Sequence, residues 1–362
     1  MANLFFRTNV APYRVDTYNI LHERLNCRMF FMSRTDSSQN YDIDKIERRC
    51  RFTPEILEKG SFCGVRYYKN IWKLIRRNKP EVVIVPEFKL IALQALAYKY
   101  LFNRKLKVVS MCDDSYDMVA NGKDFTRTHT LARKLVSPLL DDLLLVDDKV
   151  CRWFRKKFGK GQWLPIMRDE KVELPLYKEA RIISDEFRTT YGLADRKILL
   201  YVGRLAEVKN ISTLIKAIGM THGDFSTVII GDGPLRSQLQ KEASETGKDI
   251  RFPGRFEDAE IRAWYNLADV FVLPSTTEPF GAVTNEALLG GCYSILSEAC
   301  GSTCLIDDTN GRIFDPSSPE KLAAIIDEAF IKISKDPTRP DSRMNLTFDK
   351  AVVKVIENLK KQ

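Results

Sequence analysis

The sequence predicts an α/β protein built from two Rossmann-like, doubly wound domains. Short apolar runs alternate with longer amphipathic runs along the whole chain, which is the pattern of parallel strands buried on both faces and joined by helices. A polar, charged stretch at residues 167–195 interrupts this pattern near the middle. The chain has 362 residues, 44% of them hydrophobic, which is enough for two domain cores of ordinary size.

The first half is predicted to alternate strands and helices. Its short apolar runs indicate strands at residues 4–8, 27–33, 82–86, 106–112, 143–146 and 163–166. Its amphipathic runs indicate helices at residues 14–25, 68–78, 90–102, 128–140 and 149–158. The polar residues 35–41 are predicted to form a mobile loop.

The second half repeats the alternation after an interdomain linker that we place near residues 166–180. Its strands are predicted at residues 198–202, 226–230, 250–253, 270–273 and 293–297. Its helices are predicted at residues 178–191, 210–220, 235–245, 258–267, 282–289, 319–334 and 348–361. The predicted domains are therefore residues 1–170 and 171–345, followed by one final helix.

Composition argues against several classes of protein. No uninterrupted apolar run is long enough for a transmembrane helix, and the first residues are interpreted as a strand and not as a signal peptide. The eight cysteines show neither a CxxC pair nor the Cys/His spacing of a metal site. Scattered cysteines of this kind predict reduced thiols and a cytoplasmic protein.

Charge is divided unevenly between the two halves. Residues 1–170 carry 32 Lys and Arg against 20 Asp and Glu, whereas residues 171–362 carry 25 against 28. This asymmetry fits either simple solubility or attraction of the first half to an anionic membrane or a lipid diphosphate. The basic, aromatic stretches 67–77 and 150–158 fit either interfacial helices or ordinary amphipathic helices packed on the sheet. No recognised nucleic-acid-binding module is present.

The segment with the most chemical information runs from Glu278 to Glu286. It follows the predicted strand 270–273 and opens the predicted helix 282–289, so that two carboxylates bracket a turn at Gly281. Open α/β sheets bind ligands beyond the carboxyl ends of their strands. Backbone N–H groups at a helix start suit a phosphate, and a carboxylate one turn later suits ribose or sugar hydroxyls. A ligand that contains both a diphosphate and hydroxyl-rich sugars is a nucleotide sugar.

These residues resemble the Glu-x7-Glu motif of family 4 glycosyltransferases, the retaining "group 1" enzymes of the GT-B fold. Two further stretches agree in order and spacing: Gly203-Arg204-Leu205 with Lys209-Asn210, and Gly231-Asp232-Gly233-Pro234. The resemblance covers residues 197–335 well and the first half weakly. It implies two domains that face each other across a cleft, the first binding the acceptor and the second the donor. It also implies that the final segment, residues 346–362, packs back on the first domain.

The resemblance assigns roles within the second domain. Arg204 and Lys209 would neutralise the diphosphate as it leaves, which stabilises the transition state more than the ground state. Glu278 would contact the transferred sugar, and Glu286 the ribose. The other expected donor-binding positions, which act partly through their backbone, are Gly203, Gly231, Gly233, Arg255, Phe256, Phe280, Gly281, Ala282 and Val283.

The acceptor side is expected to involve Arg14, Asp113 and Asp114, which follow the predicted strands 4–8 and 106–112. Arg14 fits an acceptor or donor contact as well as it fits a plain helix residue. A carboxylate there suits removal of the acceptor's proton. Related enzymes often have His in this region and a glycine pair in the first loop, and this chain has neither. In such enzymes the leaving phosphate is thought to accept the proton.

The resulting prediction is a metal-independent, retaining hexosyltransferase without a cofactor. Its donor would be a UDP- or GDP-sugar, and its acceptor a glycan or a polyprenyl-diphosphate-linked glycan at the inner face of the membrane, in surface polysaccharide or glycoconjugate biosynthesis. Asp42 and Asp44 match the metal-binding Asp-x-Asp of another glycosyltransferase fold, and we interpret this match as coincidental. The alternatives are a nucleotide-sugar epimerase of the same fold, or a non-catalytic protein that binds nucleotide sugars or nucleic acid.

Overall fold

The computed structural model describes residues 1–34, 42–62, 65–122, 126–335 and 339–361. The loop predicted at residues 35–41 lies outside these ranges. The chain forms two compact units: residues 1–167 with 348–362, and residues 168–347. Each unit is built around one parallel sheet, as the sequence predicts for two Rossmann-like domains.

The sheet of the first unit has the strand order β3-β2-β1-β6-β7-β8-β9, and every described pair is parallel. Its strands are β1 (Asn3–Arg7), β2 (Cys27–Phe31), β3 (Glu55–Ile56), β6 (Val82–Pro86), β7 (Lys107–Cys112), β8 (Asp142–Leu145) and β9 (Gln162–Trp163). Side chains alternate across this sheet: Leu4 and Phe6 of β1 pack towards α3 and α4, and Phe5 packs on Tyr18 of α1.

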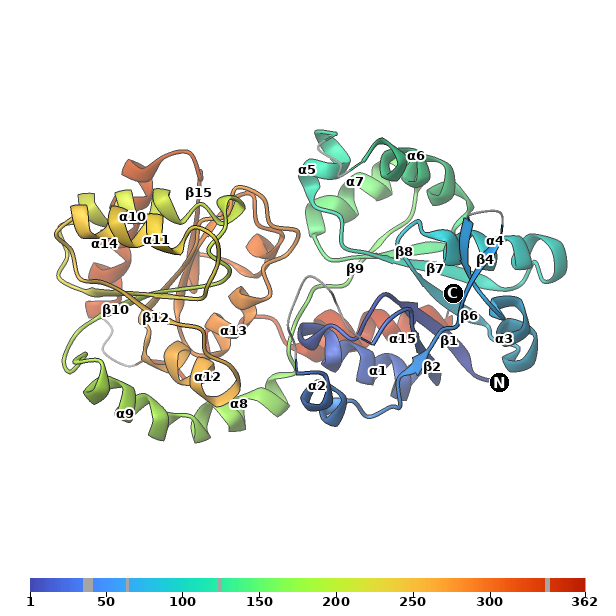
Figure 1. Ribbon diagram of the computed structural model, residues 1–362, viewed down its shortest axis with the longest axis horizontal. Helices are drawn as coiled ribbons and strands as arrows, with labels where there is room; N and C mark the ends of the chain where they lie inside the picture. The colour runs from blue at the N-terminus through green and yellow to red at the C-terminus, as the bar shows by residue number, and fades with distance from the viewer. Residues whose placement is uncertain (35–41, 63–64, 123–125, 336–338, 362) are drawn as a thin grey trace. The chain divides into compact units, whose positions relative to one another are not determined.

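Helices cover both faces of the first sheet, and a hairpin that the sequence did not predict lies beside it. The helices are α1 (Val15–Leu25), α2 (Ile43–Arg49), α3 (Ile71–Asn78), α4 (Leu90–Phe102), α5 (Tyr116–Ala120), α6 (Arg127–Val136) and α7 (Asp148–Phe158). The antiparallel hairpin joins β4 (Lys59–Phe62) to β5 (Val65–Tyr68), so the helix predicted at 68–78 begins later, at Ile71. The end of the chain, α15 (Lys354–Lys361), packs on α1 (Figure 1).

The sheet of the second unit has the order β12-β11-β10-β13-β14-β15, again with parallel pairs throughout. Its strands are β10 (Ile198–Val202), β11 (Ser226–Ile230), β12 (Ile250–Gly254), β13 (Val270–Leu273), β14 (Tyr293–Ser297) and β15 (Gly311–Phe314). Four of the five predicted strands have the predicted bounds. The exposed edge strand β15 was missed, because only half of its residues are buried.

Two helical layers enclose this second sheet. In Figure 1, α10 (Ile211–Met220), α11 (Arg236–Glu245) and α14 (Pro319–Lys335) lie on one side, and α12 (Asp258–Leu267) and α13 (Val283–Leu289) on the other. The segment expected to be a linker is instead largely helical. It forms α8 (Glu170–Glu179), which is followed by α9 (Arg181–Thr190), and both helices pack on α12. Buried ion pairs of Glu173 with Arg168 and Arg262 hold α8 in this unit.

Candidate functional site

The loop after β10 presents two cations at the carboxyl end of the second sheet. Arg204 is exposed, and its guanidinium forms no ion pair within the ranges that the structure describes. A short 3-10 turn then carries Lys209. Asn210 adopts the left-handed conformation, φ 54°, and its side-chain amide donates to the carbonyls of Pro274 (3.1 Å) and Pro316 (3.0 Å). Asn210 therefore ties this loop to the end of β13.

The loop after β13 brings Glu278 to Lys209. The carboxylate of Glu278 forms an ion pair with the Lys209 ammonium, and their side chains are only 14% and 21% exposed. The Glu278 carbonyl accepts from the amide of Gly301 (3.0 Å), and the Phe280 carbonyl accepts from the amide of Ser302 (2.8 Å). The backbone of the loop is thus fixed on one side, with a cation and a carboxylate already placed together on the other.

The turn into α13 leaves several amides without a protein acceptor. Gly281 has φ +91°, and a Cβ there would lie 2.7 Å from a methyl of Leu273, so only glycine fits. The amides of Gly281, Ala282 and Val283 donate to no acceptor within the described parts of the chain. The ring of Phe280, by contrast, is buried in the core. Such amides at a helix start can bind an anion through the backbone alone.

Glu286 lies one turn into α13, in a cluster of buried polar groups. The Tyr265 hydroxyl donates to its carboxylate at 3.3 Å, and the Tyr177 hydroxyl donates to its backbone carbonyl at 2.8 Å. Burial raises the pKa of Glu286. The positive charge of Arg168 opposes this shift, and the negative charge of Glu173 adds to it. Sequence reasoning missed these tyrosines and the Arg168–Glu173 pair, because no local motif marks them.

The glycines of the β11 loop are required by close packing of two backbones. A Cβ at Gly231 (φ +137°) would lie 1.9 Å from the carbonyl oxygen of Gly203, and one at Gly233 (φ +159°) would lie 2.4 Å from that of Leu205. The two loops are also joined by a hydrogen bond from the Leu205 amide to the Asp232 carbonyl (2.9 Å). These glycines therefore support the loop that carries Arg204, whether or not they also approach a ligand.

Arg255 and Phe256 follow β12, at the same edge of the sheet. Arg255 is exposed and forms an ion pair with Glu257 at 2.6 Å. The ring of Phe256 packs on those of Phe187 and Trp264, with centroids 5.6 and 5.7 Å apart. Phe256 thus has a packing role of its own, and a contact of either residue with a nucleobase stays a prediction.

In the first unit, Asp113 accepts ion pairs from two arginines, Arg7 of β1 and the fully buried Arg14. Burial alone would raise the pKa of Asp113, but the guanidiniums of Arg14 and Arg7 lower it overall. A carboxylate with a lowered pKa is a weak proton acceptor, so this geometry favours Asp113 as an anchor for the two arginines.

Asp114 points to a different set of partners. It is buried and pairs with Arg133 at 2.8 Å and His129 at 3.6 Å. Burial raises its pKa, although His129 and Arg133 oppose the shift. Asp42, of the Asp-x-Asp match, caps α2 by accepting from the Lys45 amide. A role of Arg14, Asp113 or Asp114 towards an acceptor stays a prediction.

Comparison with known proteins adds an independent line of evidence. The family model for glycosyl transferases group 1 matches residues 184–343. An uncharacterised glycosyltransferase of Methanocaldococcus jannaschii is 33% identical over 147 residues, which is 39% of this chain and 38% of that protein. The alpha-D-kanosaminyltransferase of Streptomyces kanamyceticus is 30% identical over 210 residues, 50% of this chain and 54% of that enzyme. The chain thus spans about half or less of these relatives' length.

A solved structure extends the likeness of fold to the whole chain. Anabaena HepE in complex with UDP superposes with a TM-score of 0.76 and 18% identity, covering 100% of this chain and 98% of that one. The same protein has been solved with UDP-glucose, with a TM-score of 0.73, 15% identity, and 99% and 98% covered. This likeness confirms the GT-B fold expected from the sequence. Residues 184–343 are similar to the glycosyl transferases group 1 family, and the likeness to HepE shows the fold of the chain.

Proposed function

We propose that this protein is a retaining glycosyltransferase that moves a hexose-type sugar from a nucleoside-diphosphate sugar to a hydroxyl of a glycan or lipid-linked glycan. The observation that carries the proposal is the grouping of Lys209, Glu278, Arg204 and the free amides of 281–283 at one edge of the second sheet. Cations and amides there suit a diphosphate, and two carboxylates, Glu278 and Glu286, suit hydroxyls.

Each side chain has a definite task in this proposal. Arg204 and Lys209 bind the diphosphate and stabilise the charge that it gains as the glycosidic bond breaks. Glu278 orients the sugar and stabilises positive charge at its anomeric carbon. Glu286, as the carboxylate, accepts hydrogen bonds from the ribose. The two cations supply the charge neutralisation that a metal ion would supply elsewhere, so we expect activity in the presence of a chelator.

The donor is proposed to be a UDP- or GDP-sugar. UDP and UDP-glucose are bound by HepE, which shares the fold. The acceptor is proposed to be a growing glycan, carried by a lipid diphosphate at the inner face of the membrane, with the basic first unit towards that surface. None of the helices in the described ranges is long and apolar enough to cross a bilayer.

Thermal-shift screening against UDP-, GDP-, ADP- and CMP-sugars tests the proposal, because a ligand that binds the folded state raises its melting temperature. One UDP- or GDP-sugar should stabilise the protein and release its nucleoside diphosphate slowly in solution. NMR of freshly formed product should show the donor's anomeric configuration retained. No stabilisation by any sugar nucleotide, combined with tight binding of nucleic acid, would falsify the proposal.

A further inference from the structure

The surface that carries this inference lies on the first unit, where α3 and α4 pack together beside the β4–β5 hairpin. Five apolar or aromatic side chains are exposed there, Trp72 on α3 and Leu93, Tyr100, Leu101 and Phe102 on α4. Leu101 and Phe102 are 66% and 64% exposed. We call this surface the α3–α4 face. Soluble monomers seldom leave large apolar side chains clustered in water, so such a patch points to a partner.

The aromatic side chains of the α3–α4 face are held in place. The ring of Trp72 packs edge-on against Tyr98 and Phe102, with centroids 6.3 and 5.3 Å apart, and its Nε1 donates to the Gln94 carbonyl at 2.9 Å. The guanidinium of Arg104 lies 5.0 Å from the ring centroid of Tyr100. The apolar side chains are therefore presented at the surface by ordered packing.

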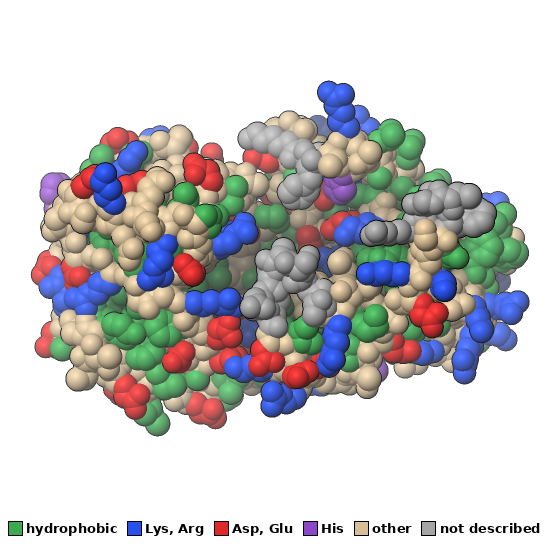
Figure 2. All heavy atoms as spheres, in the orientation of Figure 1, with side chains coloured by type: hydrophobic (Ala, Val, Ile, Leu, Met, Phe, Trp, Pro, Cys, Tyr) green, Lys and Arg blue, Asp and Glu red, His purple; other side chains and the backbone are tan. Residues whose placement is uncertain are grey.

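Cations surround these side chains, and only Lys89 and Lys99 among those described there are paired with carboxylates, Glu87 and Asp141. Residues 65–80 and 88–112 contain no Asp or Glu but eleven Lys and Arg. Five of these, exposed at the ends and outer sides of α3 and α4, form no ion pair within the described ranges: Lys73, Arg76, Arg77, Arg104 and Lys105. In Figure 2, apolar side chains gather over α4 at the right edge of the view, with Lys and Arg side chains below them over α3.

Some exposed arginines elsewhere are ion-paired. Arg255 pairs with Glu257 at 2.6 Å, Arg152 with Asp148 at 3.0 Å, and Arg181 with Asp341. Others, such as Arg155 and Arg204, form no ion pair within the described ranges, so what distinguishes the α3–α4 face is that five unpaired cations lie beside exposed apolar side chains. Exposed apolar side chains beside unpaired cations fit a partner that has an apolar interior and an anionic surface.

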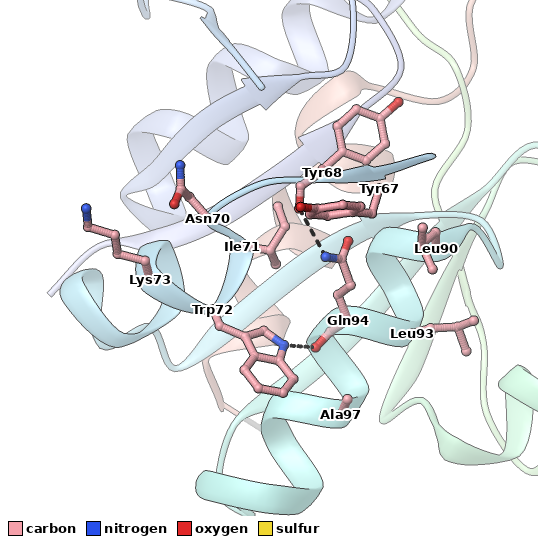
Figure 3. Close-up of a pocket in the computed structure, with 10 residues that line it drawn as sticks. All are labelled: Tyr67, Tyr68, Asn70, Ile71, Trp72, Lys73, Leu90, Leu93, Gln94 and Ala97. Carbon is pink, nitrogen blue, oxygen red and sulfur yellow. Dashed lines mark hydrogen bonds between the residues drawn. The ribbon is translucent and has the colours of Figure 1, made fainter. Parts of the chain in front are cut away.

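A groove opens on the same face. Its volume is about 510 Å³, and Tyr67, Tyr68 and Trp72 line it together with Leu93 and Gln94 (Figure 3). The side-chain carbonyl oxygen of Gln94 is buried there without a hydrogen-bond partner. The groove is large enough for a lipid headgroup or the first methylenes of an acyl chain.

We propose that the α3–α4 face binds the surface of an anionic phospholipid bilayer. Leu101, Phe102 and Trp72 enter the boundary between headgroups and acyl chains, and the unpaired cations face lipid phosphates. Nucleic acid or an acidic glycan would use the cations but leave Leu101 and Phe102 in water. The purpose of this membrane contact rests on the proposed transferase and its lipid-linked acceptor. The test of the contact does not use the transferase activity.

Flotation of the full chain with phosphatidylcholine vesicles, made with and without phosphatidylglycerol, tests the inference. The protein should float with the anionic vesicles and dissociate as salt is raised. K73Q/R76Q/R104Q should reduce partitioning about 100-fold, since each cation contributes roughly fivefold. L93S/L101S should also reduce it, with no change in charge. The control K216Q/K241Q/K321Q removes the same charge from exposed lysines of the second unit and should bind as the wild type does.

The inference would be overturned by equal flotation with neutral and anionic vesicles, by no flotation, or by the same loss in the control as in K73Q/R76Q/R104Q. Wild-type flotation by L93S/L101S would also overturn it and leave a purely electrostatic site. All variants should keep the circular dichroism spectrum and melting temperature of the wild type, which shows that they are folded. A wild type that binds anionic vesicles but no sugar nucleotide would contradict the proposed transferase and leave this inference standing.

Discussion

At the scale of single residues, the pair between Lys209 and Glu278 organises the candidate site. The ammonium that is proposed to bind the diphosphate forms an ion pair with the carboxylate that is proposed to bind the sugar. The two groups are mostly buried, so water screens them weakly. Binding of a donor would place a new anion beside Lys209, and Glu278 would then be free to accept from sugar hydroxyls.

This exchange predicts opposite effects for the two partners. Lys209→Met should weaken UDP binding by roughly 10- to 100-fold, because a hydrogen bond to a charged group contributes about 1.5–3 kcal/mol. Glu278→Gln should bind UDP as tightly as the wild type or more tightly, since it releases Lys209, yet it should transfer sugar far more slowly. Isothermal titration and a turnover assay separate the two. A tenfold loss of UDP affinity in Glu278→Gln would contradict this arrangement.

The raised pKa of Glu286 predicts that the affinity for UDP depends on pH. The folded pKa of Glu286 is raised above the ordinary 4.5. The ionised form is the better acceptor for ribose hydroxyls, so UDP affinity should rise with pH through a midpoint above 4.5. Glu286→Gln should bind UDP weakly and without that step, as titrations across the acidic range would show. A flat profile for the wild type would argue against ribose binding at Glu286.

The raised pKa of Glu286 also affects the stability of the fold, which should fall as pH rises. A raised folded pKa means that the folded state holds the proton more tightly than the unfolded state. The stabilising contribution of Glu286 is therefore complete below pH 4.5 and is lost as pH rises through the folded pKa. Glu286→Gln, which stays neutral, should unfold at higher denaturant concentration than the wild type at pH 8. Equal midpoints at pH 8 would mean that burial of this carboxylate has no cost.

At the scale of elements, the loops after β10 and β11 form one packed support for Arg204. Gly231→Ala should destabilise the protein by about 2–4 kcal/mol, since a strained φ adds to roughly 1–3 kcal/mol of overpacking against Gly203. Gly247→Ala is a matched control: Gly247 also has positive φ (+67°), but a Cβ there meets nothing within 4 Å. It should cost only about 1 kcal/mol. Urea unfolding measures both, and equal costs would show that the loops are not tightly packed.

The elements also show what the sequence can and cannot predict. β10, β11, β13 and β14 were predicted because strands buried on both faces are continuous apolar runs. β3 has only two residues, and β4 has the sequence Lys-Gly-Ser-Phe, so neither carries such a run. α8 contains Pro175 and many charges, and it was expected to be linker. Its ion pairs of Glu173 with Arg168 and Arg262 are tertiary contacts that no local pattern encodes.

Some residues of the candidate site could be predicted from the sequence, and others could not. Arg204, Lys209, Glu278 and Glu286 were predicted because the motifs that contain them follow strands and resemble those of family 4 glycosyltransferases. Asn210, which fastens one loop to the other, was noted only as part of a motif, and the hydroxyl of Tyr265 was not expected at all. Tyr265 comes from α12, 21 residues before Glu286, and only the packing of α12 against α13 brings the two together.

At the scale of the whole molecule, the chain crosses from the first unit to the second and returns at residue 348. The returning helix α15 packs on α1, and the side chain of Ile356 is fully buried there. The final residues of the chain are therefore part of the first unit's core. Disturbing them should affect that unit and leave the donor site of the second unit intact.

Two substitutions on α15 test this division. Ile356→Ala should lower the stability of the first unit by about 2–5 kcal/mol, the usual cost of truncating a buried aliphatic side chain. Glu357→Ala removes only an exposed pair with Arg24 at 3.8 Å and should cost at most about 1 kcal/mol. Calorimetry would report the stability, and UDP titration the donor site. Loss of UDP binding in folded Ile356→Ala protein would mean that the units are not independent.

The central claim is that residues at the edge of the second sheet bind a nucleotide sugar. A crystal structure with the bound donor tests this claim most directly. The account predicts a diphosphate within hydrogen-bond distance of Arg204 and Lys209, the sugar beside Glu278 and the ribose against Glu286. A donor bound at any other place, with these four side chains untouched and Lys209 still paired with Glu278, would contradict it.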